Sequence, residues 1–140
     1  MQPRISVITL GVADLDRAVA FYRDGLGWRT QGIVGTEFDN GAVAFFDLEG
    51  GLKLALWPRA SIAADTGLPM QPASATEATL GHNVASRVQV LSTMQQAARA
   101  GATIVKPPAE TFYGGFAGCF QDPDGHVWEV VFNPHLASLG

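Results

Sequence analysis

The pattern of hydrophobic and polar residues repeats along this chain. In each half, an apolar run typical of a strand is followed by the residue spacing of an amphipathic helix. In the first half, a β-branched and apolar run at residues 5–12 predicts a strand, and Asp14 is a favourable N-cap for a helix after it. Gly25 and Gly27 supply the helix stop. Further strands are expected at residues 28–34, 42–48 and 52–57. The first half is therefore predicted to be β-α-β-β-β.

The second half repeats that order. A strand is expected at residues 80–85, and a helix that starts at Ser86 or Ser92 should end before Gly101. The remaining strands are predicted at residues 103–105, 116–121 and 126–132. The predicted fold class is α+β, with two β-α-β-β-β modules that form one curled eight-stranded mixed sheet and helices on its convex face.

These modules are expected to make one domain over residues 1–140. Module one spans about residues 4–57 and module two about residues 79–134. The segment between them, residues 58–78, is rich in Pro, Ala, Ser and Thr, and a short helical turn is expected at residues 61–65. A connection of this length often covers a site.

Two similar segments, one in each half of the chain, support the repeat. The segment Asp122–Phe132 aligns without a gap on Asp47–Trp57, at an offset of 75 residues (122 − 47). In this alignment Glu129, an acid in the middle of a predicted strand, falls opposite Leu54. A buried acid without a partner is unfavourable, so its presence there favours a functional role for Glu129.

Charge and cysteine content narrow the class of protein. The 140 residues include 9 basic and 13 acidic side chains, a net charge of −4 that is dispersed along the chain. This argues against nucleic acid or a membrane surface as the main partner. One cysteine, Cys119, cannot form an internal disulfide, and no apolar run is long enough to cross a bilayer. With no signal-peptide pattern at the N-terminus, a cytoplasmic location is expected.

Two segments carry a family resemblance, Leu10–Gly27 and Gly118–Glu129. Together with the repeat they resemble the vicinal oxygen chelate superfamily of glyoxalases, bleomycin-resistance proteins and extradiol dioxygenases, over about residues 5–134. In metal-using relatives, each module contributes one metal ligand from its first strand and one from its last. The resemblance carries these four positions to Val7, Leu54, Thr79 and Glu129. Only Glu129 can bind a metal well, so no cofactor is predicted, although the resemblance leaves a divalent metal open.

Other side chains are candidates for contacts with a ligand. Asn83 should share the face of Thr79 and offer an amide. His82 lies an odd number of residues after Thr79, so its side chain is expected on the other face. A rigid turn at residues 106–108 leads into a glycine-rich stretch in which Phe112, Tyr113 and Phe116 can form an apolar wall.

The sequence favours a protein that binds a small organic molecule in the trough between the modules, without the family metal. Val7, Leu54, Thr79 and Asn83 would line that trough, and Glu129 is the catalytic candidate. The alternative is a lyase or isomerase acting on a small carbonyl compound, with Glu129 as base or as metal ligand. The resemblance also implies a homodimer. The sequence leaves open whether the protein is an enzyme or a binding protein, and which ligand it binds.

Overall fold

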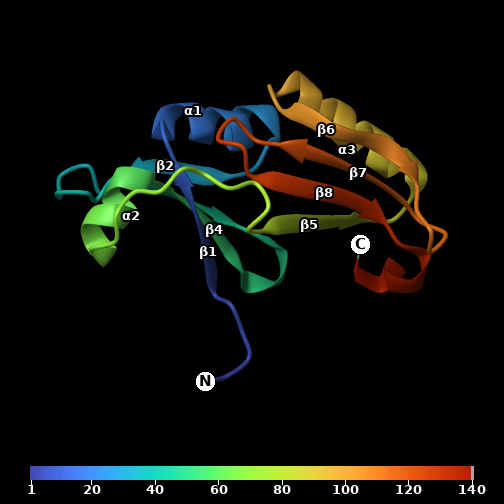
Figure 1. Cartoon of the computed structure of the whole chain (residues 1–140), viewed down its shortest axis with the longest axis horizontal. Helices are drawn as coiled ribbons and strands as arrows, with labels where there is room; N and C mark the ends of the chain where they lie inside the picture. Colours follow the sequence, from blue (N-terminus) through green and yellow to red (C-terminus); the bar gives the residue numbers. More distant parts are fainter. Residues whose placement is uncertain (140) are drawn as a thin grey trace. The chain divides into compact units, whose positions relative to one another are not determined.

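A computed structural model describes residues 1–139 of the chain (Figure 1). The chain divides into two compact units, one covering Met1–Pro72 and the other beginning at Ala73. Each unit contains one four-stranded mixed sheet, so that the eight strands lie in two sheets. The predicted α+β class with two β-α-β-β-β modules is confirmed. None of the helices in the described residues is long and apolar enough to span a bilayer.

The first unit follows the predicted order. Its elements are β1 (Val7–Val12), α1 (Leu15–Val19), η1 (Ala20–Gly25), β2 (Thr30–Val34), β3 (Val43–Asp47), η2 (Glu49–Gly51), β4 (Lys53–Pro58) and α2 (Arg59–Thr66). The strand order is β1-β4-β3-β2, with β1 parallel to β4 and the other pairs antiparallel. Asp14 caps α1 by accepting a hydrogen bond of 3.1 Å from the backbone of Arg17. The helical turn expected in the linker is present as α2.

Helix α1 continues into a π-helical segment, η1, that places an aromatic side chain in the core of the first unit. Tyr22 is fully buried there, and its ring lies 5.6 Å from that of Trp28 and 6.0 Å from that of Phe46. Phe46 pairs with Leu54 in the ladder of β3 and β4. These contacts define one helix-covered face of the first sheet, to which Ala44 and Leu56 also belong.

The second unit contains β5 (Thr79–Val84), α3 (Arg87–Arg99), β6 (Thr103–Glu110), β7 (Phe116–Gln121), β8 (Val127–Phe132) and η3 (Pro134–Leu139). Its strand order is β5-β8-β7-β6, which matches the first sheet. Of the two possible helix starts, Ser86 is the cap and accepts a hydrogen bond of 3.2 Å from Gln89. Strand β6 is longer than predicted, because an edge strand with register shifts at residues 104–109 tolerates Pro107 and Pro108.

Helix α3 covers one face of the second sheet. Its buried side chains are Val90, Met94 and Ala97. A Cβ atom at Gly118 would lie 3.0 Å from the Met94 terminal carbon, so the helix and β7 are in close contact here. Gly118 pairs with Val130, and Phe120 with Trp128. The stacked rings of Phe120 and Trp128, 6.3 Å apart, therefore belong to the helix-covered face.

The strand ladders correct the alignment of the two modules by one residue. Phe46 pairs with Leu54 in the first sheet, and Phe120 pairs with Trp128 in the second. Both equivalences give an offset of 74 residues (120 − 46 and 128 − 54), not 75. The counterpart of Glu129 is therefore Ala55, and Leu54 corresponds to Trp128. A shift of one residue along a strand moves a side chain to the opposite face, so this correction matters for the site.

The turn between β7 and β8 is organised by a buried acid. Asp122 is 4% exposed, and its carboxylate accepts hydrogen bonds from the backbone of Asp124 (3.0 Å) and of His126 (2.9 Å). Its second oxygen lies 2.8 Å from Nδ1 of His126. These bonds set the first residues of β8 in register with β7.

Replacing Asp122 with Ala should destabilise the fold by about 2–4 kcal/mol, because several donors lose a buried charged acceptor at once. Thermal or denaturant unfolding measures the change. Asp65→Ala, at an exposed position of α2, is the control and should change stability by no more than about 0.5 kcal/mol. Equal effects of the two substitutions would contradict this account of the turn.

Candidate functional site

Each sheet has one face covered by its helix and one open face, and the accessible polar side chains of the central strands lie on the open faces. In β4, Leu54 and Leu56 are buried on the helix side, while Lys53 is exposed. In β8, Trp128 and Val130 are buried, while Glu129 between them is exposed. Side chains alternate along a strand, so these exposed charged groups lie on the face away from the helix, although that face is also buried in part, at Ala55 and Val131.

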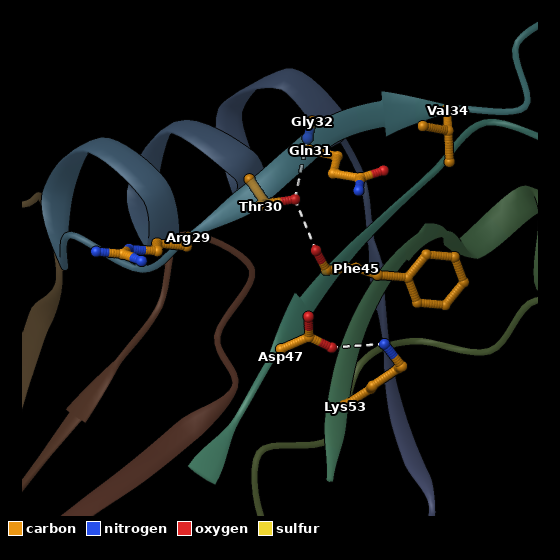
Figure 2. A pocket seen from close by; sticks show the side chains of 8 residues that line it. All are labelled: Arg29, Thr30, Gln31, Gly32, Val34, Phe45, Asp47 and Lys53. Carbon is orange, nitrogen blue, oxygen red and sulfur yellow. Dashed lines mark hydrogen bonds and ion pairs between the residues drawn. The ribbon is translucent and has the colours of Figure 1, made fainter. Parts of the chain in front are cut away.

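A cavity of about 750 Å³ lies on the first unit, against β2, β3 and the start of β4. In Figure 2 the side chains of Gln31, Val34, Phe45 and Lys53 project to the same side of these strands. The lining residues are Arg29, Thr30, Gln31, Gly32, Val34, Phe45, Asp47 and Lys53. This volume is typical of sites for small organic molecules.

A bulge in β2 shapes one wall of the cavity. The pairing of β2 with β3 shifts between Thr30 and Ile33, and Gly32 adopts a φ of +87° that favours glycine. The Thr30 hydroxyl donates a hydrogen bond of 2.6 Å to the carbonyl of Phe45 and accepts one of 3.1 Å from the backbone of Gly32. The bulge therefore has its own hydrogen bonds, and it leaves the Gln31 amide at the cavity (Figure 2).

The charges at the cavity are not balanced. Lys53 and Asp47 form an ion pair of 2.5 Å, with side chains that are 48% and 84% exposed. Arg29 adds a second cation at the start of β2, and its guanidinium points away from the Phe45 ring (Figure 2). Two basic residues and one acidic residue line the cavity, whereas the whole chain carries −4.

The structure separates two residues that were predicted to act together in the first module. Val7 is 42% exposed and shares the open face with Lys53, its partner in the ladder. Leu54 is 1% exposed and lies under the helix, next to Phe46. The expectation that Leu54 shares a face with Val7 is wrong, because the alignment that placed it there was shifted by one residue.

In the second module the predicted residues do share a face. Thr79, Gly81 and Asn83 are every second residue of β5 and lie on one face, and Gly81 pairs with Glu129. Glu129 also pairs with Cys119, and Cys119 with Lys106, so that a carboxylate, a thiol and an ammonium group follow one row across the open face. Burial raises the pKa of the Cys119 thiol; the Glu129 carboxylate adds to this rise and Lys106 opposes it. The thiol is therefore a poor nucleophile at neutral pH.

The three predicted aromatic residues of the second module do not make one wall. Phe112 is fully exposed in the turn after β6, where its ring meets that of Tyr113 edge-on at 5.2 Å. Phe116 lies in β7 two residues before Gly118, and alternation therefore places it on the helix side. Phe112 and Tyr113 therefore belong to a hairpin turn, and Phe116 belongs to the helix-covered face of β7.

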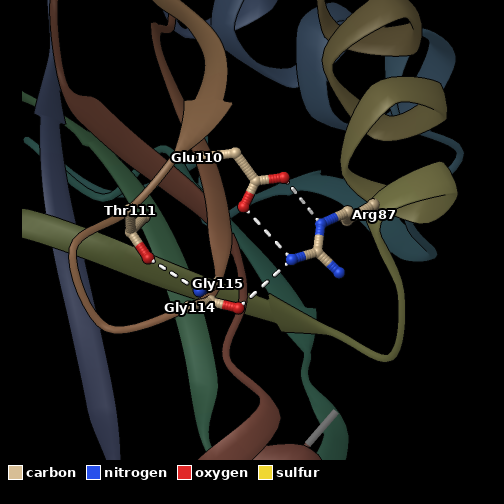
Figure 3. A network of polar contacts seen from close by, with 5 residues as sticks. All are labelled: Arg87, Glu110, Thr111, Gly114 and Gly115. Carbon is tan, nitrogen blue, oxygen red and sulfur yellow. Dashed lines mark hydrogen bonds and ion pairs between the residues drawn. The ribbon is translucent and has the colours of Figure 1, made fainter.

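An arginine that was not predicted holds this hairpin. Arg87, the first residue of α3, forms a bidentate pair with Glu110 (2.9 and 3.1 Å) and donates a bond of 3.2 Å to the carbonyl of Gly114 (Figure 3). Its guanidinium also lies 5.3 Å from the centre of the Phe132 ring. The hydrogen bonds from Arg87 lower the pKa of Glu110.

The metal positions implied by the sequence do not fit a metal ion. With the corrected offset they are Val7, Ala55, Thr79 and Glu129, of which one offers a strong ligand. Across the described residues, no cluster of three or more His, Cys, Asp or Glu side chains could hold a metal. His82 pairs with Val130 and so lies toward the helix-covered side, away from Glu129.

The comparisons with known proteins agree with this architecture. The model of the Glyoxalase/Bleomycin resistance protein/Dioxygenase superfamily matches residues 4–130. The chain belongs to this superfamily. A glyoxalase-related enzyme from Fulvimarina pelagi is similar in structure, with 34% sequence identity, a TM-score of 0.79, and coverage of 94% of this chain and 89% of that chain.

More distant members of the superfamily share the fold. A lactoylglutathione lyase from Agrobacterium tumefaciens is 20% identical, with a TM-score of 0.68 and coverage of 97% of both chains. A family enzyme from Burkholderia phytofirmans PsJN is 20% identical, with a TM-score of 0.75 over 91% of this chain and 96% of that one. A search of curated proteins found no significant match. Superfamily membership alone leaves the reaction open, because this fold hosts unrelated functions.

Sequence reasoning missed the residues that line the cavity. The signal in residues 42–48 is weak, because Asp47 is the one polar residue of this stretch. Alternation places Phe45 on the same face as Asp47, which indicates an exposed position for Phe45. Gln31 gave no comparable signal, because the bulge that positions it depends on the pairing of β2 with β3.

Replacing Arg87 with Met should raise the pKa of Glu110 toward that of an ordinary carboxyl group, since the hydrogen bonds that favour the ionised form are lost. A pKa that is lowered by folding stabilises the protein above the ordinary carboxyl range, and this contribution disappears as the pH falls through the lowered value. An NMR titration of the Glu110 carboxyl measures the change. Arg99→Met, at the other end of α3, is the matched control, and an unchanged Glu110 pKa in Arg87→Met would refute the pairing.

Proposed function

We propose that this protein binds a small organic molecule in the cavity on the open face of its first sheet, without the family metal. The observation that carries this proposal is the combination of volume and lining: about 750 Å³, bounded by the half-exposed apolar side chains of Phe45 and Val34 and by the polar groups of Gln31 and Lys53. Exposed apolar side chains at a concave surface favour binding, because a ligand removes them from water.

The donor set supports the metal-free part of the proposal. Affinity for a ligand needs only the cavity, whereas the family metal would need ligands that Val7, Ala55 and Thr79 cannot supply. Bleomycin-resistance proteins, which the superfamily name includes, are a precedent for a function that consists of binding. Superfamily membership therefore agrees with a binding role for this chain.

Phe45→Ala should weaken ligand binding about tenfold, because it removes the aromatic wall of the cavity. Ligand-detected NMR with a mixture of small aromatic and carbonyl compounds identifies binders, and calorimetry then compares the variants. Phe38→Ala is the matched control: Phe38 is 68% exposed and does not line the cavity. Equal binding by wild type and Phe45→Ala, or no binding by wild type, would refute the proposed site.

A second candidate function is a lyase or isomerase that uses Glu129 as a base. One observation favours it: the Glu129 carboxylate is exposed on the open face beside Gly81, whose missing side chain leaves space for a substrate. A carboxylate in this setting can remove a proton from a carbon next to a carbonyl group.

If Glu129 is the base, Glu129→Gln should slow exchange of α-protons of small carbonyl compounds in D₂O by about 100-fold or more, because the amide keeps the shape but cannot accept the proton. NMR follows the exchange, with Glu49→Gln, in the exposed η2 turn, as the control. Equal rates for wild type and Glu129→Gln would remove Glu129 from the mechanism.

The assay is run with and without a chelator, and a stoichiometric transition metal in the untreated protein would contradict the metal-free proposal.

A further inference from the structure

We propose that the ligand of the first-sheet cavity is a planar organic monoanion, such as an aromatic carboxylate, whose charged group is bound by Lys53. This inference rests on the proposed binding function and specifies its ligand class. It follows from three properties of the cavity: its local charge, the exchangeable ion pair within it, and its flat apolar wall.

The local charge favours one negative charge on the ligand. Arg29 and Lys53 line the cavity together with one acid, Asp47, which leaves one positive charge in excess. The chain as a whole carries −4, so the cavity is a basic site on an acidic protein. A local field of this sign raises the concentration of small anions at the cavity and disfavours cations.

The ion pair of Lys53 and Asp47 can exchange partners. Both side chains are accessible, with 48% of Lys53 and 84% of Asp47 exposed. Ion pairs between exposed groups contribute little to stability, because water solvates both partners well when they separate. A ligand carboxylate can therefore take the place of Asp47 at the Lys53 ammonium, while Asp47 turns to solvent. The ligand then gains a charge-assisted hydrogen bond in a partly enclosed site.

The apolar part of the cavity lining fits a flat group. Phe45 is 42% exposed and Val34 is 43% exposed, both on the same side of the sheet (Figure 2). A planar ring gains more contact with an aromatic face than a puckered one, through offset or edge-to-face packing. The Gln31 amide, presented by the bulge of β2, can donate or accept a hydrogen bond at the rim of such a ring.

The test compares matched acids and amides by calorimetry: benzoate with benzamide, 2-naphthoate with 2-naphthamide, and indole-3-acetate with indole-3-acetamide. In wild type, at least one acid is expected to bind about tenfold more tightly than its amide, as one charge-assisted bond would give. Lys53→Met should abolish this preference. Asp47→Asn should strengthen binding of the acid, because it removes the competing carboxylate.

Two arginine variants distinguish direct contact with the ligand from long-range electrostatic attraction of the ligand. Arg29→Met should weaken acid binding a few-fold at low salt and have no effect at high salt, since its guanidinium points away from the Phe45 ring and acts through the field. Arg99→Met makes the same change of charge at the end of α3, outside the cavity, and should leave acid binding unchanged.

The outcomes distinguish this inference from the proposed function. Amides that bind as tightly as their acids, or an acid preference that survives in Lys53→Met, would overturn the inference and leave the binding function intact. Binding of no member of any pair would also overturn it; the binding function then stands only if other compounds of the screening mixture bind in a manner that depends on Phe45.

Discussion

In each sheet one face packs against α1 or α3, and this burial governs the rest of the molecule. In the first unit the layer is anchored by Tyr22 against Phe46, and in the second by Met94 against the strand at Gly118. Strands alternate their side chains, so Leu54 and Trp128 lie in the core under the helices, and the charged Lys53 and Glu129 lie on the other face. The hydrophobic effect thus fixes which residues are available for chemistry, and a shift of one residue in register would exchange the two sets.

The two open faces have diverged although their scaffolds match. The first has a cavity with the aromatic side chain of Phe45 and an exposed ion pair between Lys53 and Asp47. The second has a row in which Glu129 is flanked by Gly81 and Cys119. Charged groups can occupy both faces because they stay in contact with water, whereas the helix side would impose the full cost of desolvation. The same repeat therefore supports one face suited to binding and another with a candidate base.

The proposed function depends on shape and charge and not on a metal bound at the positions that the family resemblance implies. Val7, Ala55 and Thr79 occupy equivalent places around the two open faces, and none offers a strong metal ligand. Under the proposed function, an aromatic surface, an amide and a lysine in the cavity of the first unit would recognise an organic ligand without a metal. The hydrogen bonds of Arg87 to Glu110 and Gly114, by contrast, have a structural role, because they hold the hairpin that carries Phe112.

The sequence by itself determined the element order, the α+β class and the Asp14 cap, because these depend on periodicity and on hydrogen bonds between residues close in the chain. It also identified Glu129 as an acid in the middle of a strand, and the structure adds that this acid is exposed between buried neighbours. Only the tertiary structure decided that Ala55, not Leu54, is its counterpart, and that Gln31 and Lys53 lie at one cavity. Strand register and bulges result from pairing between distant segments, and a gap-free alignment of weak repeats cannot detect a shift of one residue. The sequence thus determined the scaffold, and long-range pairing decided which side chains meet on its open faces.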